Sequence, residues 1–173
     1  MKIIKIIFLI LMVTMISCSR TLKDFVIEGY EKEKISRYNI EDKIYKDLEN
    51  NNIIQIEYRA ITINEGQNKS ATFLSFLSKS SNIIKINILK LNYIYKNTAV
   101  NFTNPIEPSF QLTEFNKNIN MSYEVGKGYN DFNVGDKVNV VIDIEYEYNS
   151  NIYTINANFN IVCVWVEYPA ELP

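Results

Sequence analysis

Two alternations of apolar and polar residues dominate the last third of the chain. The first runs from Val138 to Tyr148 and the second from Ile152 to Tyr168, separated by Asn149-Ser150-Asn151. Successive side chains of a strand point to opposite faces of a sheet, so each segment is a predicted strand with one polar face. Together they predict an antiparallel hairpin. Beyond Ile161 both faces become apolar, which predicts cover on both sides of that end.

Alternation with a period of two also marks residues 53–63 and 83–95. Its phase slips near Ala60 and again at Leu89, and each slip indicates a β-bulge. Shorter strands are expected over 70–78, 109–115 and 119–125, and the glycine-bearing segment 126–135 is expected to be a loop. About seven strands at this spacing predict an all-β, mainly antiparallel chain. The favoured architecture is a single β-sandwich, immunoglobulin-like; a helix-backed antiparallel sheet or an open barrel is the alternative.

One segment has helical periodicity. Over residues 39–51, Ile40, Ile44 and Leu48 form an i, i+4, i+8 stripe, and Asn39 is a suitable N-cap. The spacing predicts one short N-terminal helix.

The N-terminus has the pattern of an export signal. Lys2 and Lys5 precede an uncharged apolar run over residues 6–16. A run of this length is shorter than the roughly 20 residues that a membrane-spanning helix needs. It fits the apolar region of a signal peptide.

The apolar run ends in Met15-Ile16-Ser17-Cys18, which resembles the lipobox of bacterial lipoproteins. Met15 departs from the leucine that this motif prefers. The resemblance implies cleavage before Cys18, a diacylglycerol on its sulfur and acylation of its amine. It also implies export and lipid anchoring to a bacterial membrane, and Ser19, in place of aspartate, favours the outer membrane or cell surface over the inner membrane.

The predicted organisation therefore has three parts. Residues 1–17 are a signal peptide, 18–38 a lipidated tether and 39–173 the β-rich domain. In the tether, one early strand is allowed near Phe25.

Composition removes several classes of chemistry. The chain contains no histidine, which excludes Ser-His-Asp catalysis and imidazole metal sites. A net charge of −2 without a basic cluster argues against a nucleic-acid partner. The second cysteine, Cys163, lies in an apolar strand and is expected to be a buried thiol. No cofactor and no metal site are expected.

Asp143, Glu145 and Glu147 lie on one face of the first hairpin strand. Such a row could serve a glycosidase, but regular acidic positions opposite threonine and asparagine are typical of a solvated sheet face. We expect these carboxylates to be exposed, and we predict no catalytic residue.

Tyr146, Tyr148 and Tyr153 are the candidate ligand contacts, because they gather near the hairpin end, where cover is less complete. A two-residue loop would pair Tyr146 with Tyr153, and a four-residue loop would pair Tyr148 with Tyr153. Trp165 shares a face with Phe159 and is expected in the core.

These patterns predict a membrane-anchored envelope lipoprotein whose domain binds or scaffolds without catalysis. Its partners would be the membrane, through the lipid, and a protein or glycan ligand. The alternatives are a structural or assembly lipoprotein without a small ligand, and a carboxylate-dependent hydrolase.

Overall fold

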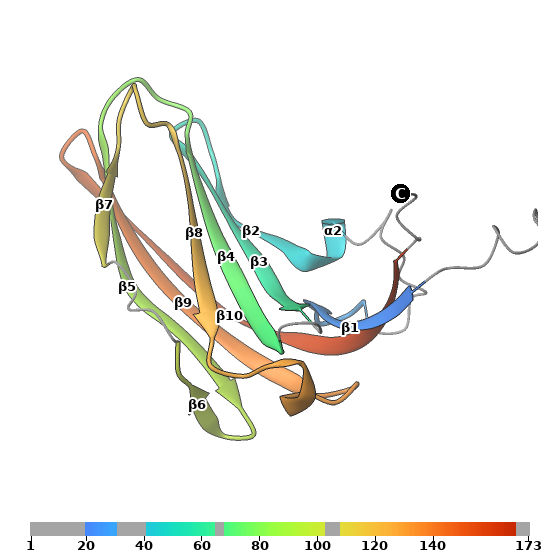
Figure 1. The fold of residues 1–173 in the computed structure, drawn as a ribbon. Helices are drawn as coiled ribbons and strands as arrows, with labels where there is room; N and C mark the ends of the chain where they lie inside the picture. Colours follow the sequence, from blue (N-terminus) through green and yellow to red (C-terminus); the bar gives the residue numbers. More distant parts are fainter. Residues whose placement is uncertain (1–19, 31–40, 65–67, 103–107, 169–173) are drawn as a thin grey trace, which may run out of the picture.

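The computed structural model describes residues 20–30, 41–64, 68–102 and 108–168. These residues form two antiparallel sheets that pack face to face (Figure 1). The strands are β1 (Arg20–Ile27), β2 (Tyr45–Asn50), β3 (Ile54–Asn64), β4 (Lys69–Ser78), β5 (Ile84–Tyr95), β6 (Thr98–Val100), β7 (Ser109–Leu112), β8 (Asn118–Val125), β9 (Lys137–Tyr148) and β10 (Asn151–Tyr168). Two short turns of helix, α2 (Glu41–Ile44) and η2 (Tyr129–Asp131), complete the described elements.

Sheet A has the order β1-β10-β9-β5-β6, and β7 also pairs with β5. Sheet B has the order β2-β3-β4-β8. The predicted all-β, mainly antiparallel, sandwich-like architecture is confirmed. No helix among the described residues is long and apolar enough to cross a membrane.

The predicted hairpin is confirmed in its two-residue-loop register. Tyr146 pairs with Tyr153, and Ile144 pairs with Ile155. Asn149 and Ser150 both have positive φ angles, 49° and 62°, which matches the type I′ turn that two-residue hairpins favour.

Both predicted bulges are present as register shifts. One lies between Arg59 and Thr62 in β3, and the other between Ile88 and Lys90 in β5. Leu89 is the extra residue of the second bulge, so its side chain is exposed while Ile88 and Leu91 on either side stay buried.

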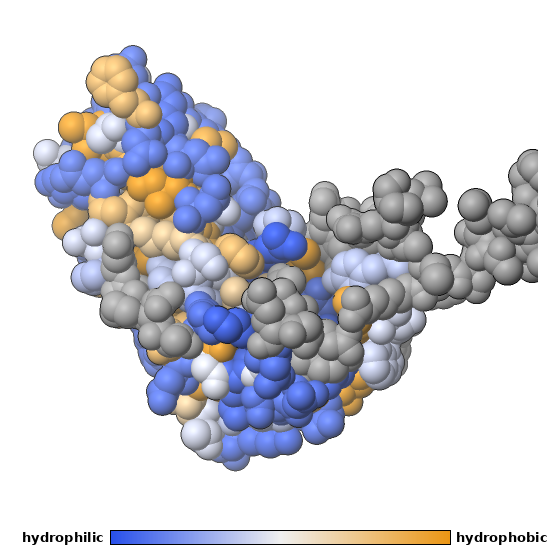
Figure 2. Space-filling model, in the orientation of Figure 1, coloured by the Kyte–Doolittle hydropathy of each residue, from blue (hydrophilic) through white to orange (hydrophobic). Residues whose placement is uncertain are grey.

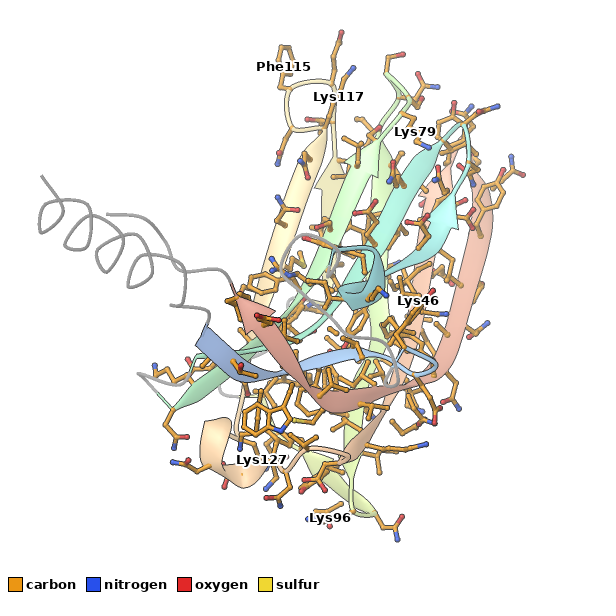
Figure 3. All side chains as sticks on the ribbon, turned by 90° about the vertical axis from the view of Figure 1, so that its right-hand side faces the viewer. Lys46, Lys79, Lys96, Phe115, Lys117 and Lys127 are labelled. Atoms are coloured by element: carbon orange, nitrogen blue, oxygen red, sulfur yellow. The ribbon has the colours of Figure 1, made fainter. Side chains whose placement is uncertain are left out.

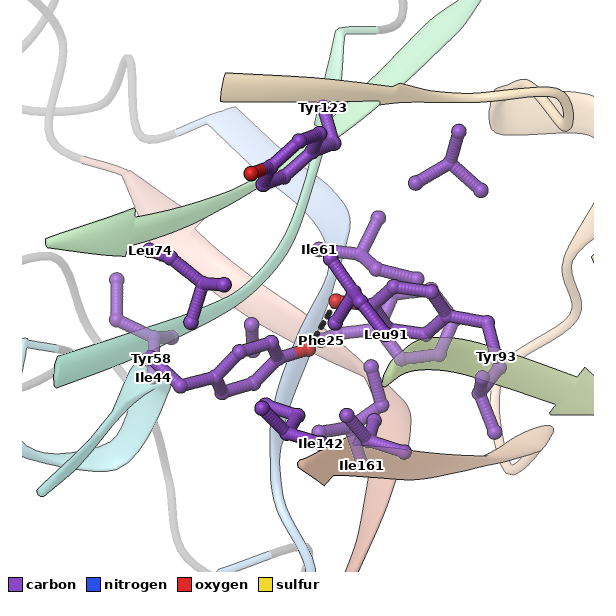
Figure 4. Packing of buried hydrophobic residues seen from close by; sticks show 14 of the residues in the cluster. Phe25, Ile44, Tyr58, Ile61, Leu74, Leu91, Tyr93, Tyr123, Ile142 and Ile161 are labelled. Atoms are coloured by element: carbon purple, nitrogen blue, oxygen red, sulfur yellow. Dashed lines mark hydrogen bonds between the residues drawn. The ribbon is translucent and has the colours of Figure 1, made fainter. Parts of the chain in front are cut away.

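The core lies between the sheets and contains a chain of buried hydroxyl groups. The Tyr93 oxygen lies 3.0 Å from the Tyr58 hydroxyl and 2.7 Å from Thr72 Oγ1, and Thr72 donates to the carbonyl of Arg59 at 2.8 Å. Figure 4 shows Tyr58 and Tyr93 meeting among Leu74, Leu91 and other apolar side chains. Since Tyr58 belongs to β3 and Tyr93 to β5, the hydroxyls join the two sheets.

The predicted helix over 39–51 is wrong. Only α2 is helical among its described residues, and the chain then enters β2, which pairs with β3. Ile44 and Leu48 are four residues apart, a spacing that places side chains on one face of a helix and equally on one face of a strand. After Ile44, pairing with β3 favours the strand over a continued helix.

The predicted tether over 18–38 contributes a strand to the folded domain. All of β1 pairs with β10, and Phe25 and Val26 are fully buried. The described domain therefore extends at least back to residue 20, ahead of the predicted boundary at 39. Lys23 and Asp24 interrupted the apolar pattern of this strand, but Lys23 Nζ donates to the Phe132 carbonyl and Asp24 accepts from Tyr168 Oη, so both polar groups have partners.

The end of β10 is covered on both faces up to Val164, as predicted. Cys163 is buried and free, and burial raises the pKa of its thiol to about 12. The prediction of a core position for Trp165 is wrong, because its side chain is 52% exposed. Phe25 pairs with Cys163 across the two strands, and the ring of Phe132 packs against Phe25. Trp165 instead pairs with Lys23.

Candidate functional site

Four connections lie together at one end of the sandwich, at the top of Figure 1. They are residues 51–53 between β2 and β3, 79–83 between β4 and β5, 113–117 between β7 and β8, and 149–150 between β9 and β10. Figure 3 shows Phe115, Lys117 and Lys79 at this end.

Hydrogen bonds connect these turns to one another. The backbone N–H of Ser78 donates to the carbonyl of Lys117 at 2.7 Å, and that of Lys79 donates to the carbonyl of Ile53 at 2.9 Å. Asn82 Nδ2 donates to Asn149 Oδ1 at 3.0 Å. The connections therefore form a bonded unit, which fixes the backbones of these turns relative to one another.

Several large apolar side chains at this end face solvent. Phe115 is 99% exposed, Ile152 66% and Ile83 55%, and the ring of Tyr153 is partly exposed. We call these four residues the apolar tip. In Figure 2 apolar atoms lie among hydrophilic ones at this end. A fully exposed phenylalanine on a turn has no role in the core of its own chain, so it is free to contact another molecule.

The structure separates the three predicted tyrosines. Tyr146 is buried, its hydroxyl accepts from Asn51 Nδ2 at 3.1 Å, and burial raises its pKa. The inner face of β9 directs this predicted ligand contact into the core, so its ring is not at the surface. Tyr148 is half-buried, with its hydroxyl 3.2 Å from Ser80 Oγ.

Tyr153 is the most exposed of the three. Its ring stacks on Tyr146 with 4.8 Å between centroids and 10° between planes. The buried ring supports the exposed one from behind, so Tyr153 presents a rigid aromatic face.

The acidic row lies on the outer face of sheet A, and all three side chains are partly exposed. Lys85 Nζ bonds Glu147 Oε2 at 2.9 Å, Asn87 donates to Glu145 at 3.2 Å, and Lys90 lies opposite Asp143. Across β10, Thr154 and Asn156 border the same row. Such cross-strand partners stabilise charges on a solvated surface.

A shallow depression of about 160 Å³ lies on the outer face of sheet B. Its lining comes from β3, β4 and the start of β8: Gln55, Glu57, Ser75, Leu77, Asn118 and Asn120. Beside it on β3, the Arg59 guanidinium lies 5.5 Å from the ring centroids of both Tyr45 and Phe73. Amide and carboxylate groups here can hydrogen-bond a polar ligand.

Cys18 lies outside the described residues. It precedes Arg20, the first residue of β1, by two positions. Two residues of extended chain separate their Cα atoms by at most about 7 Å. A lipid on Cys18 would therefore hold the start of β1 close to the membrane surface.

Three members of the apolar tip, Phe115, Ile83 and Ile152, are not among the residues that the sequence predicts for a site. The sequence pattern places Phe115 at the end of a strand and Ile83 and Ile152 at the starts of two others. For Phe115 and Ile83 the local signal is a run of polar neighbours in the sequence, which is typical of turns: Thr113-Glu114-Phe115-Asn116-Lys117 and Ser80-Ser81-Asn82-Ile83.

Comparison of the chain with protein-family profiles and with curated proteins gives no match.

Proposed function

We propose that this protein is a lipid-anchored bacterial envelope protein whose sandwich binds a partner protein through the apolar tip, without catalysis. The single observation that supports it best is Phe115, which is fully exposed on a hydrogen-bonded turn at the same end of the sandwich as the exposed Ile83, Ile152 and Tyr153.

The length and position of β10 support a separation between the proposed lipid anchor and the proposed partner-binding tip. β10 begins at Asn151 beside the tip and reaches Tyr168, which pairs with Arg20. Its 18 residues have a contour length of about 55 Å at about 3.3 Å per residue. An anchor at Cys18 thus lies at the other end of the longest strand from the tip.

The energetics favour a protein partner. Burying one large apolar side chain is worth about 1.5–3 kcal/mol. Aromatic side chains near the centre of an interface often supply much of its affinity. Tyr153 is suited to this because its ring is already stacked on Tyr146, and Phe115 because its whole side chain is available for burial.

Site-specific photocrosslinking in living cells tests the contact. A photoreactive phenylalanine analogue at position 115 should give a discrete adduct, and the same analogue at Lys96, on the β5–β6 turn at the other end of sheet A, should not. Ile83→Ser should weaken the adduct at 115. Equal adducts at both positions, or none at 115, would contradict the proposal.

Lipidation is tested separately by labelling with an alkyne fatty acid. The wild-type chain and Cys163→Ala should both incorporate the label, whereas Cys18→Ala should not. Because the chain has only these two cysteines, the pair is a matched control. Label retained in Cys18→Ala would contradict a lipid on that residue.

A glycan is the second candidate ligand, supported by the polar depression on sheet B. Glu57→Gln together with Asn120→Ala should then abolish chemical-shift changes that an oligosaccharide mixture causes, while leaving the Phe115 adduct unchanged. The immunoglobulin-like relationship also stays a proposal; two antiparallel sheets connected by crossings between them support it.

A further inference from the structure

Part of β10 has a strand partner on one side only among the described residues. β9 pairs with residues Asn151 to Val162, whereas β1 pairs only with residues Ile161 to Tyr168. β1 leaves the sheet at the turn over residues 28–30, where the Glu28 N–H donates to the Asn160 carbonyl at 2.9 Å. Beyond that bond, no other described strand pairs with the edge from Asn151 to Phe159, which we call the open edge.

The turn geometry shows which backbone N–H and C=O groups of β10 point away from β9, toward the open edge; we call their residues outward-facing. In a two-residue hairpin the flanking residues, here Tyr148 and Asn151, bond to each other, and bonded and non-bonded pairs then alternate. The outward-facing residues are therefore the even-numbered ones: Ile152, Thr154, Asn156 and Asn158. The bond from Glu28 to Asn160 agrees with this assignment, since Asn160 is the next residue of the same set. These four residues present a ladder of N–H and C=O groups about 20 Å long.

The open edge carries neither of the two residue types that commonly prevent strand pairing, charged residues and proline. From Tyr148 to Val166 the chain contains no charged residue and no proline. Natural edge strands normally carry such residues, or are short, because an exposed ladder recruits another strand. The chemistry that fits a ladder of this kind is an extended backbone.

We infer that this edge pairs with the same edge of a second copy of the chain. The two β10 strands run antiparallel, with Ile155 of each copy on the two-fold axis. Each Thr154 then lies opposite Asn156 of the other copy, and each Tyr153 lies opposite Ala157. On the outer face Thr154 meets Asn156 and Ile152 meets Asn158, and on the inner face Ile155 meets its own copy and Tyr153 meets Ala157. No like charges meet, as a two-fold interface requires.

The position of Glu28 selects this register. Centring the pair on Asn156 would set Ile152 against Asn160, whose carbonyl already accepts from Glu28. Centring on Ile155 uses all four outward-facing residues of both copies and ends where β1 begins to occupy the edge.

The shape of the molecule allows both copies to face one surface. The end of β10 and β1 bend out of sheet A toward the side of sheet B (Figure 1), and β1 contacts β3. A two-fold axis between antiparallel edges is perpendicular to the sheet, so both bent ends leave on the same side. The pairing uses the strand segment that carries Ile152 and Tyr153 of the apolar tip, whereas Phe115 and Ile83 lie outside it.

Cysteine crosslinking of the full chain in its native membrane tests the register. Two differently tagged chains, one with Thr154→Cys and one with Asn156→Cys, are expressed together and oxidised. Bonded cross-strand residues have Cα atoms about 5.5 Å apart, which suits a disulfide. A mixed adduct is expected, with little adduct from either variant alone or from the wild-type chain, which controls for Cys18 and Cys163. No mixed adduct, or equal adducts from the single variants, overturns the inference.

A charge at the edge gives a second readout. Thr154→Lys should convert the detergent-solubilised protein from dimer to monomer in sedimentation equilibrium. In the dimer each lysine would replace a neutral threonine opposite Asn156, so the substitution would place two positive charges at the interface. Thr98→Lys, an exposed threonine on β6, is the matched control and should remain dimeric. A wild-type monomer, or a Thr154→Lys dimer, overturns the inference.

Discussion

At the scale of single residues, the buried hydroxyl chain is the most consequential feature of the interior. Tyr58, Tyr93 and Thr72 are fully buried, and each hydroxyl has a partner within the chain. Buried polar groups cost free energy when a partner is lost, more than an average hydrogen bond contributes when made. These buried hydroxyl groups therefore favour one alignment of the two sheets over alignments in which one sheet is shifted along the other.

Tyr93→Phe tests this role. The change removes the central hydroxyl and leaves those of Tyr58 and Thr72 each short of a partner. We expect a loss of about 1–3 kcal/mol in the free energy of unfolding, measured by urea denaturation. Tyr153→Phe, at an exposed ring, is the control and should change stability by less than about 0.5 kcal/mol. Equal effects would refute the special role of the buried chain.

The same tyrosines predict an alkaline limit to stability. Burial raises the pKa of Tyr58 and of Tyr93 above the ordinary value of 10.0. Because the unfolded tyrosines ionise first, their contribution to stability is complete below pH about 10 and falls as the pH rises above it. Urea midpoints measured between pH about 9 and about 11 should decrease. The decrease should be smaller in Tyr93→Phe, and an identical slope would argue against these groups.

At the scale of elements, alternation with a period of two was sufficient for most strands. It located the β9–β10 hairpin, its allowed registers and both bulges, because a half-buried strand must separate apolar from polar side chains. It could not identify β2, since the spacing of Ile44 and Leu48 fits a continuous helix, whereas the helix ends at Ile44 and Leu48 lies in the strand. It allowed a strand only near Phe25 and missed most of β1, whose buried Asp24 accepts a hydrogen bond from Tyr168 far along the chain.

The candidate site was predictable only in part, for a related reason. The sequence predicts Tyr153 as a site residue because it lies near the hairpin turn. Tyr146 is also a tyrosine near the same turn, but its side chain is buried. Exposure at a strand end depends on which turn packs beside it, here the turn carrying Asn51. Local sequence contains no such information about distant turns.

The β9–β10 turn gives a prediction at this scale. Ser150 adopts a φ of 62°, a conformation that glycine adopts without steric cost. Ser150→Gly creates the Asn-Gly pair that type I′ turns prefer, and should stabilise the fold by about 0.5 kcal/mol in urea denaturation. Ser150→Val is the opposite control, because a β-branched side chain disfavours positive φ. Destabilisation by glycine would show that the Ser150 side chain has a role of its own.

At the scale of the whole molecule, β1 completes the core although it lies next to the segment predicted to be an anchor. It buries Phe25 and Val26 against β10 and brings Lys23 to the Phe132 carbonyl. A chain comprising residues 31–173 lacks this cover.

We expect residues 20–173 to unfold in one sharp thermal transition. Residues 31–173 should show a broadened transition and should bind a hydrophobic dye. Trp165, the single tryptophan, lies on β10 opposite Lys23 and reports on this region by fluorescence. Equal transitions in the two chains would show that β1 is dispensable.

The pairing of β1 with β10 also has a mechanical consequence. With Cys18 as the anchor and the tip held by a partner, tension enters the domain at Arg20 and acts along the axis of β1. The eight residue pairs between β1 and β10 have hydrogen bonds perpendicular to that axis. The tension therefore shears all of these bonds together instead of peeling them one at a time from an end. The strand nearest the lipid is thus oriented as a clamp, and the domain can transmit a pull between membrane and partner without unravelling from its first residue.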